Sequence, residues 1–195
     1  ETLLPKRSKV RKIQHHPALP YKEIGEFMKA LRKLEGVAAQ AMEFLILTAC
    51  RTSEVIGATW SEIDFKEDVW TIPAKRMKAG RDHRIPLSPR ATAILEGFKS
   101  RGNDYLFPGK TKRHPLSNMA MLKHLDRMKR SDLTVHGFRS SFRDWAAEQT
   151  DFPREVAEAA LAHVVGDKAE AAYRRGDLFE KRRLMMDSWS AYCGG

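Results

Sequence analysis

Apolar side chains recur at helical spacing from Pro20 to Leu34. The interval is three or four residues until Gly36 ends the run, and a nearly continuous apolar stretch follows. The first pattern is typical of an amphipathic helix, and the second predicts a helix buried in the core. Three helices are expected here: Pro20 to Leu34, Val37 to Ala49, and a short one capped by Thr52 or Ser53 that runs to Ile56.

The pattern then changes to short segments rich in β-branched and aromatic residues. They are Glu62 to Phe65, Val69 to Ile72 and Arg84 to Leu87. Charged or glycine-containing turns separate them, which predicts a three-stranded antiparallel sheet. The second turn, Pro73 to His83, is long and basic.

Helical spacing returns after the sheet. Ser88 caps a helix with Pro89 at its first position, and Ser117 caps one that carries Met121, Leu122, Leu125 and Met128. Further helices are expected from about His136, Pro153 and Asp167, and a capping box from Asp177 to Glu180 opens a last helix to about Tyr192. The sequence therefore predicts a mostly α-helical α+β domain with one small three-stranded antiparallel sheet over residues 17–195.

The N-terminal residues 1–16 are basic and contain few apolar side chains. We interpret them as a linker from an upstream DNA-binding domain, with a disordered terminus as the alternative.

Charge and composition narrow the class of protein. The net charge is +10 and the sequence pI is about 9.8, which favours a polyanionic partner such as nucleic acid. No apolar run is long enough for a membrane span, and no secretory signal is evident, so we expect a cytoplasmic protein. Two cysteines and no His-Glu-x-x-His pattern give no reason to expect a metal site, and no glycine-rich nucleotide loop suggests a cofactor.

The helix near His136 separates basic from aromatic side chains. At about 100° per residue, His136, Arg139 and Arg143 share one face, and aromatic residues cluster on another. We expect the basic face to look outward at an anion, with the helix N-terminus adding to the attraction. A solvated amphipathic helix is the alternative for this segment taken alone.

Two more basic residues lie in positions that suit phosphate binding. Arg51 follows the apolar helix and precedes Glu54 by three residues, so the carboxylate could orient its guanidinium or merely form a surface pair. Lys78 lies in the basic turn between two strands, where it could reach DNA and protonate a leaving oxygen. The neighbouring Lys75, Arg76 and Arg81 are candidate DNA-binding residues.

The C-terminal third adds a histidine and a tyrosine. His163 ends an apolar helix, and Tyr173 lies ten residues later among small residues. Taken singly, each is more often a helix-end hydrogen bonder or a packing residue. A tyrosine can also hold a phosphoryl group covalently.

The order of these residues resembles the catalytic set of the tyrosine recombinases, and the chain is similar to the catalytic domain of a phage-type or genomic-island integrase. The resemblance covers about residues 20–192. It rests on the segments Thr48 to Glu54, Lys78 to Leu87, His136 to Arg139, Leu161 to His163, and Ala172 with Tyr173. One departure is the Leu-Ala-His segment, where Leu-Gly-His is common in the family.

The resemblance implies a role for each residue. Tyr173 attacks the scissile phosphate and forms a 3′-phosphotyrosyl bond. Arg51 and Arg139 stabilise charge on the phosphate, Lys78 is the general acid for the 5′-oxygen, His136 assists proton transfer, His163 hydrogen-bonds the phosphate, and Glu54 orients Arg51. The implied partner is double-stranded DNA carrying attachment sites, bound by a homotetramer with possible DNA-bending accessory proteins, and no cofactor or metal is needed.

Three other classes remain open at this point. A type IB topoisomerase uses similar groups but relaxes one duplex, whereas a recombinase exchanges strands between two. A DNA-binding regulator would lack catalysis, and a metal nuclease would need a carboxylate cluster that the sequence does not suggest.

Overall fold

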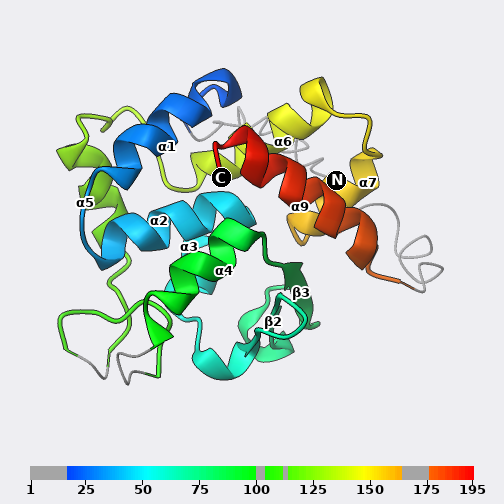
Figure 1. Ribbon diagram of the computed structural model, residues 1–195, viewed down its shortest axis with the longest axis horizontal. Coiled ribbons are helices and arrows are strands. Elements are labelled where there is room, and N and C mark those ends of the chain that lie inside the picture. The colour runs from blue at the N-terminus through cyan, green and yellow to red at the C-terminus, as the bar shows by residue number, and fades with distance from the viewer. Residues whose placement is uncertain (1–16, 100–103, 112–113, 164–175) are drawn as a thin grey trace, which may run out of the picture.

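Helix α2 (Val37–Thr48) forms the centre of a mostly helical fold (Figure 1). The computed structural model describes residues 17–99, 104–111, 114–163 and 176–195. Helices α1 (Ile24–Arg32), α3 (Thr52–Ile56), α4 (Pro89–Glu96), α5 (Ala120–Arg127) and α9 (Phe179–Tyr192) all contact α2. Because α2 is surrounded in this way, nearly all its residues from Ala39 onward are buried, as the apolar pattern predicts.

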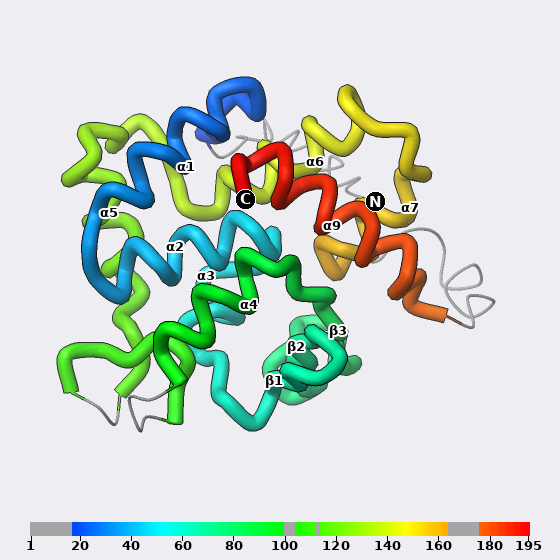
Figure 2. The backbone as a smooth tube through the Cα atoms, in the orientation of Figure 1, coloured from blue at the N-terminus to red at the C-terminus, as the bar shows by residue number. Residues whose placement is uncertain are grey.

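The three predicted strands form one antiparallel sheet in the order β1–β2–β3. They are β1 (Ile63–Asp64), β2 (Val69–Ile72) and β3 (His83–Pro86). Trp70 pairs with Ile63 on one side and with Ile85 on the other, and its ring is fully buried. The tube in Figure 2 shows the sheet below α9, on the opposite side of the molecule from α1.

The remaining elements complete the body around α2. They are the 3₁₀ turns η1 (Tyr21–Glu23), η2 (Trp60–Glu62) and η3 (Ala74–Arg76), and the helices α6 (Gly137–Gln149) and α7 (Arg154–Ala160). The predicted fold class is confirmed. The helix expected near Asp167 lies outside the described residues.

Helix α9 joins the sheet to the helices. It contacts α7, β3 and α2, and the Trp189 indole donates to the Ile46 carbonyl over 2.8 Å. The buried Arg182 guanidinium donates to the backbone carbonyl of Arg84 in β3 and, over 2.8 Å, to Asp177. Helix α9, near the C-terminal end of the chain, therefore holds α7, β3 and α2 together.

Three predicted helix caps are wrong, although the helices themselves are present. Arg51, rather than Thr52 or Ser53, is the N-cap of α3. Met119, rather than Ser117, precedes α5, and Ser117 contributes only its carbonyl, which accepts from the Ala120 amide.

The capping box predicted for the last helix is also replaced by another arrangement. Leu178 is the N-cap of α9, with a left-handed φ of 56°, and Asp177 caps from one residue earlier by accepting from the Phe179 amide over 3.2 Å. The predicted Ser88 cap of α4 is confirmed, since its hydroxyl accepts from the Ala91 amide.

Candidate active site

The four residues of the segment His136-Gly137-Phe138-Arg139 lie in different environments. His136 is exposed at the start of α6, whereas Phe138 is buried and its ring centroid lies 4.9 Å from that of Phe27. A side chain at Gly137 would lie 2.2 Å from the Pro17 carbonyl oxygen, so only glycine lets the N-terminal segment cross here. Arg139 points inward.

Arg139 is a buried guanidinium held by two backbone carbonyls. Its Nη1 donates to the Ala49 carbonyl over 2.6 Å, and its Nη2 donates to the Leu161 carbonyl over 2.7 Å. Nη2 also lies 3.1 Å from Nε2 of His163. Burial and the nearby Arg51 charge lower the pKa of Arg139, and its buried Nε has no hydrogen-bond partner in the protein.

The expectation that all three basic residues of α6 look outward is therefore wrong for Arg139. It is 4% exposed, whereas His136 is exposed and Arg143 is half-exposed. The aromatic half of the prediction is confirmed, because Phe138, Phe142 and Trp145 are all buried. Two carbonyl acceptors offset the cost of burying the arginine.

Arg51 reaches the same region from the end of α2. Ala49 takes a left-handed φ of 51° that ends α2, and Arg51 then begins α3. The buried Glu54 carboxylate accepts from the Arg51 backbone amide and from its Nη1, both over 2.8 Å. The predicted pair between Arg51 and Glu54 is present, and it leaves part of the guanidinium accessible, with 26% of the side chain exposed.

His163 closes the cluster from the end of α7. Ala162 takes a left-handed φ of 49°, which turns the chain after the helix and brings His163 back toward α6. The His163 Nδ1 lies 2.7 Å from Oε2 of Glu158, and its Nε2 faces Arg139. Glu158 is buried and was not identified from the sequence, because no local pattern pairs it with His163.

A second histidine lies near this cluster. His83 begins β3, and burial and the nearby Arg182 charge lower its pKa to about 4, so that it is neutral near pH 7. The nearby Ala160 backbone, at the end of α7, opposes this lowering of the pKa. The start of β3, which follows the basic turn, therefore lies near the end of α7, just before His163.

The basic turn between β2 and β3 is folded rather than extended. Met77 is buried, Gly80 takes a positive φ of 63°, and the Asp82 carboxylate accepts from the Ala74 amide over 2.7 Å. This arrangement leaves three cationic side chains exposed. They are Lys75, Lys78 and Arg81.

Arg76 has partners within the protein. Its Nη1 pairs with Glu62, and its Nη2 donates to the backbone carbonyl of Glu54. The side chain is 18% exposed, so it ties the base of the turn to α3 beside Arg51. These contacts give Arg76 a structural role. Its assignment to DNA binding stays a prediction, and its exposed neighbours are better placed to contact DNA.

The structure thus brings together Arg51, Arg139 and His163, places His136 at the start of α6, and connects the Lys78 turn to α3. Tyr173 lies outside the described residues. Within the described ranges, no group of three His, Cys, Asp or Glu side chains is arranged to hold a metal ion.

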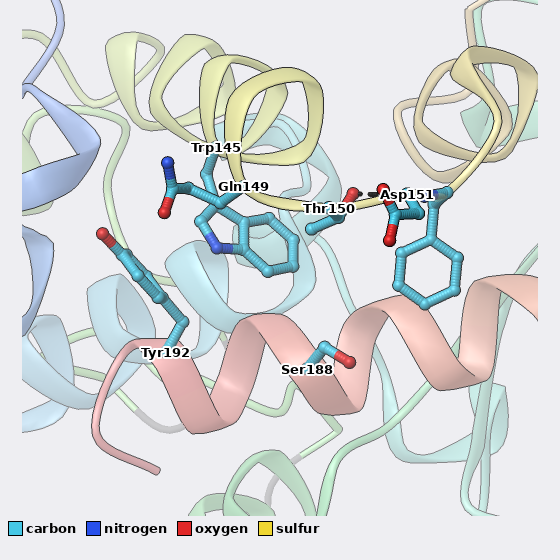
Figure 3. A pocket seen from close by; sticks show the side chains of 7 residues that line it. Trp145, Gln149, Thr150, Asp151, Ser188 and Tyr192 are labelled. Atoms are coloured by element: carbon cyan, nitrogen blue, oxygen red, sulfur yellow. Dashed lines mark hydrogen bonds between the residues drawn. The ribbon is translucent and has the colours of Figure 1, made fainter.

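A large hollow lies elsewhere, between the end of α6 and α9. Figure 3 shows Trp145, Gln149 and Thr150 on one side and Ser188 and Tyr192 on the other, around a cavity of about 630 Å³. None of the clustered basic residues lines it. The hollow is therefore a feature separate from the guanidinium and imidazole cluster.

The cluster of guanidinium and imidazole groups, one of them with an unused buried donor, defines a site for an oxyanion such as phosphate. The chain belongs to the phage integrase family, whose sequence profile matches residues 17–177. In the part of the chain that the structure describes, no helix is long and apolar enough to cross a membrane.

Prophage integrases are among the relatives of this chain. It is 42% identical over 149 residues to the prophage integrase IntA of Escherichia coli K12, a match to 74% of this chain and 36% of that protein. It is 35% identical over 186 residues to the prophage integrase IntZ of the same organism, covering 93% of this chain and 46% of that protein. The chain therefore spans half or less of the length of these relatives.

Solved structures of integrases share the fold. The integrase from mycobacterium phage Brujita matches with a TM-score of 0.65 at 18% identity, over 94% of this chain and 60% of that one. A lambda integrase tetramer bound to a Holliday junction matches with a TM-score of 0.58 at 20% identity, over 77% of this chain and 48% of that one.

Proposed function

We propose that this chain is the catalytic domain of a site-specific tyrosine recombinase, an integrase that cuts and rejoins DNA through a 3′-phosphotyrosyl intermediate. Family membership supports the class of enzyme. The observation that carries the chemistry is the buried Nε of Arg139, which has no partner in the protein. A buried unsatisfied donor is costly, and a phosphate oxygen is a suitable acceptor for it.

The arginines would stabilise the charge on the phosphate. Arg139 is fixed by two carbonyls and Arg51 by Glu54, so neither guanidinium has to reorganise during reaction. Preorganised donors of this kind stabilise charge that develops in a transition state. An Arg side chain suits the role because its planar fork matches two phosphate oxygens.

Tyr173 would be the nucleophile. Of the three described tyrosines, Tyr21 donates to Glu148 over 2.8 Å, and Tyr192 stacks on Trp189. The Tyr173 hydroxyl would displace the 5′-oxygen of the next nucleotide, and Lys78 would supply that oxygen with a proton. His136 would assist proton transfer at the tyrosine, and His163 would bind the phosphate. Because the phosphotyrosyl bond retains the energy of the phosphodiester, rejoining needs no nucleotide cofactor.

The partner of this domain would be double-stranded DNA with attachment sites. The similar lambda integrase is described as a dimer on a core site and as a tetramer on a Holliday junction, which supports a homotetramer on DNA here too. Bending of the DNA by accessory proteins and a cytoplasmic location complete the proposal. Lys75, Lys78 and Arg81 are the exposed side chains of the turn that we expect at the duplex.

The test is covalent capture on DNA. A pool of nicked duplexes of randomised sequence removes the need to know the target, because a nick near the cut lets the short product diffuse away and traps the adduct. We expect a protein–DNA adduct that survives denaturation and forms in excess EDTA, and Tyr173→Phe should abolish it while duplex binding persists.

Each rival class gives a different result in this assay. Binding without any adduct supports a regulator, and strict dependence on magnesium supports a nuclease. An adduct mapped to Tyr105 or Tyr192 would overturn the assignment of the nucleophile. Duplexes selected by the adduct can then be offered in pairs: exchange of strands supports a recombinase, and relaxation alone supports a topoisomerase.

A further inference from the structure

Glu158 is a buried carboxylate that contacts His163 of the candidate site. It lies in α7, is 5% exposed, and its Oε2 is 2.7 Å from Nδ1 of His163. The other ring nitrogen, Nε2, is 3.1 Å from Nη2 of Arg139. One buried carboxylate, one imidazole and one buried guanidinium therefore lie in a row.

The partners define where the imidazole proton is. An arginine N–H can only donate, so Nε2 of His163 accepts through its lone pair. Burial opposes ionisation of Glu158, but the hydrogen bond from His163 and the nearby Arg143 charge keep its pKa below the ordinary value. Glu158 is thus a carboxylate that accepts, and the proton of neutral His163 lies on Nδ1.

The second carboxylate oxygen also faces a cation. Oε1 lies 3.0 Å from Nε of Arg143 in α6 and 3.8 Å from Nε of Arg154. Oε2 accepts a hydrogen bond on the side of the site, whereas Oε1 is buried without a hydrogen-bond partner among the described residues and lies beside positive charges. Only a carboxylate suits both sides, because an amide would turn its NH₂ toward one of them.

We infer that Glu158 is a positioning residue, which fixes the ring orientation of His163 and holds its Nδ1–H, so that Nε2 accepts from Arg139 in the free protein and, once protonated, can donate to the phosphate. The inference rests on the proposed function for its consequence in catalysis. Its structural content, the tautomer, stands independently of any reaction. Removal of a partner that orients a metal-ligating histidine typically costs about 10–100-fold in affinity or activity, and we expect an effect of that order here.

Glu158→Gln is the most informative variant because the glutamine side chain has nearly the same shape as glutamate. Whichever way the amide lies, its NH₂ faces either the Arg143 guanidinium or Nδ1 of His163. In the second case the ring proton moves to Nε2, where it meets the Arg139 donor. Arg143 is half-exposed, so adding Arg143→Met removes one conflict and lets the amide oxygen accept from Nδ1–H.

Glu155→Gln is the matched control, since it makes the same change three residues earlier in the same helix. Nitrogen-15 NMR of the histidine rings in the whole chain reads the tautomer, with His163 assigned by loss of its signals in His163→Phe. The rate of adduct formation on the selected nicked duplex reads the consequence.

We expect the Nδ1–H tautomer in wild type and Glu155→Gln, its loss in Glu158→Gln, and its return in Glu158→Gln with Arg143→Met. The adduct rate should fall at least about tenfold in Glu158→Gln and recover in the double variant. An Nε2–H tautomer in wild type, or a Glu158→Gln variant with the wild-type tautomer and rate, would overturn the inference. Absence of adduct in wild type would refute the proposed function, and the tautomer measurements would still decide the role of Glu158.

Discussion

Arg139 is 4% exposed, yet one of its guanidinium nitrogens, Nε, has no partner in the protein. The two carbonyls that hold it come from the end of α2 and the end of α7. The side chain therefore does two things at once. It links three helices, and it presents a fixed charge to whatever anion binds beside His163.

Replacement of Arg139 by lysine tests whether the planar guanidinium, with its several N–H donors, is needed or only its positive charge. A single ammonium cannot bridge both carbonyls and keep a donor for phosphate, so Arg139→Lys should lose about 3 kcal/mol of transition-state stabilisation, roughly a hundredfold in adduct rate. The rate is measured on the selected nicked duplex, and thermal unfolding separates lost chemistry from lost fold. The exposed Arg127→Lys is the control. An Arg139→Lys variant with normal rate would make the guanidinium structural only.

Lys78 is exposed in the β2–β3 turn, and its proposed task is to protonate the leaving 5′-oxygen. A general acid matters only while the leaving group needs a proton. Lys78→Ala should therefore fail on ordinary DNA but recover on DNA with sulfur at the 5′-bridging position. Lys75→Ala, made in the same turn, should cleave both substrates alike. If sulfur gives no recovery, Lys78 only contacts DNA.

Local residue pairs could be predicted from the sequence, and distant ones could not. The pair between Arg51 and Glu54 spans three residues, so helical spacing is enough to suggest it. The Arg139 carbonyl partners lie 90 and 22 residues away, and their positions depend on how α2, α6 and α7 pack. A helical wheel shows which residues share a face of a helix, but not which other elements pack against that face. Helical spacing therefore wrongly predicted that Arg139 points toward solvent.

At the scale of elements, hydrophobic periodicity located the helices and strands, but it did not locate their ends. The start of α3 shows why: the Glu54 carboxylate accepts from the Arg51 amide, and the Arg51 carbonyl accepts from the Glu54 amide, so no hydroxyl cap is required. The end of α7 depends on backbone conformation instead. Ala162, at a φ of 49°, occupies a position where glycine would be unstrained.

Ala162→Gly is expected to stabilise the domain. A left-handed alanine costs about 1–2 kcal/mol, and the greater freedom of glycine in the unfolded chain returns part of that, leaving a gain of about 0.5–1 kcal/mol. Urea unfolding measures it. Ala159→Gly, inside α7, should shift stability in the other direction by about 1 kcal/mol. A loss of stability in Ala162→Gly would show that the alanine methyl group contributes packing that outweighs the strain.

At the scale of the molecule, the net charge of +10 gives an attraction to DNA that does not depend on sequence. The exposed cations of the turn, Lys75, Lys78 and Arg81, lie on the sheet side, away from α1 (Figures 1 and 2). The chain spans only 36% and 46% of two prophage integrase relatives, so part of the grip that such a protein has on a duplex can come from elsewhere. We therefore expect this chain alone to bind DNA weakly and with little sequence preference.

Salt dependence tests this picture and locates the contacts. Each phosphate neutralised contributes about −0.9 to the slope of log K against log salt, so three turn cations account for roughly −3. Lys75→Ala with Arg81→Ala should make the slope shallower by about 2 for any duplex, as measured by fluorescence anisotropy over a salt series. The matched pair Lys29→Ala with Lys33→Ala, on the α1 side, should leave it unchanged. Equal effects from both pairs would show diffuse attraction over the whole surface, and tight site-specific binding near 0.15 M salt would show that this chain suffices to hold its target.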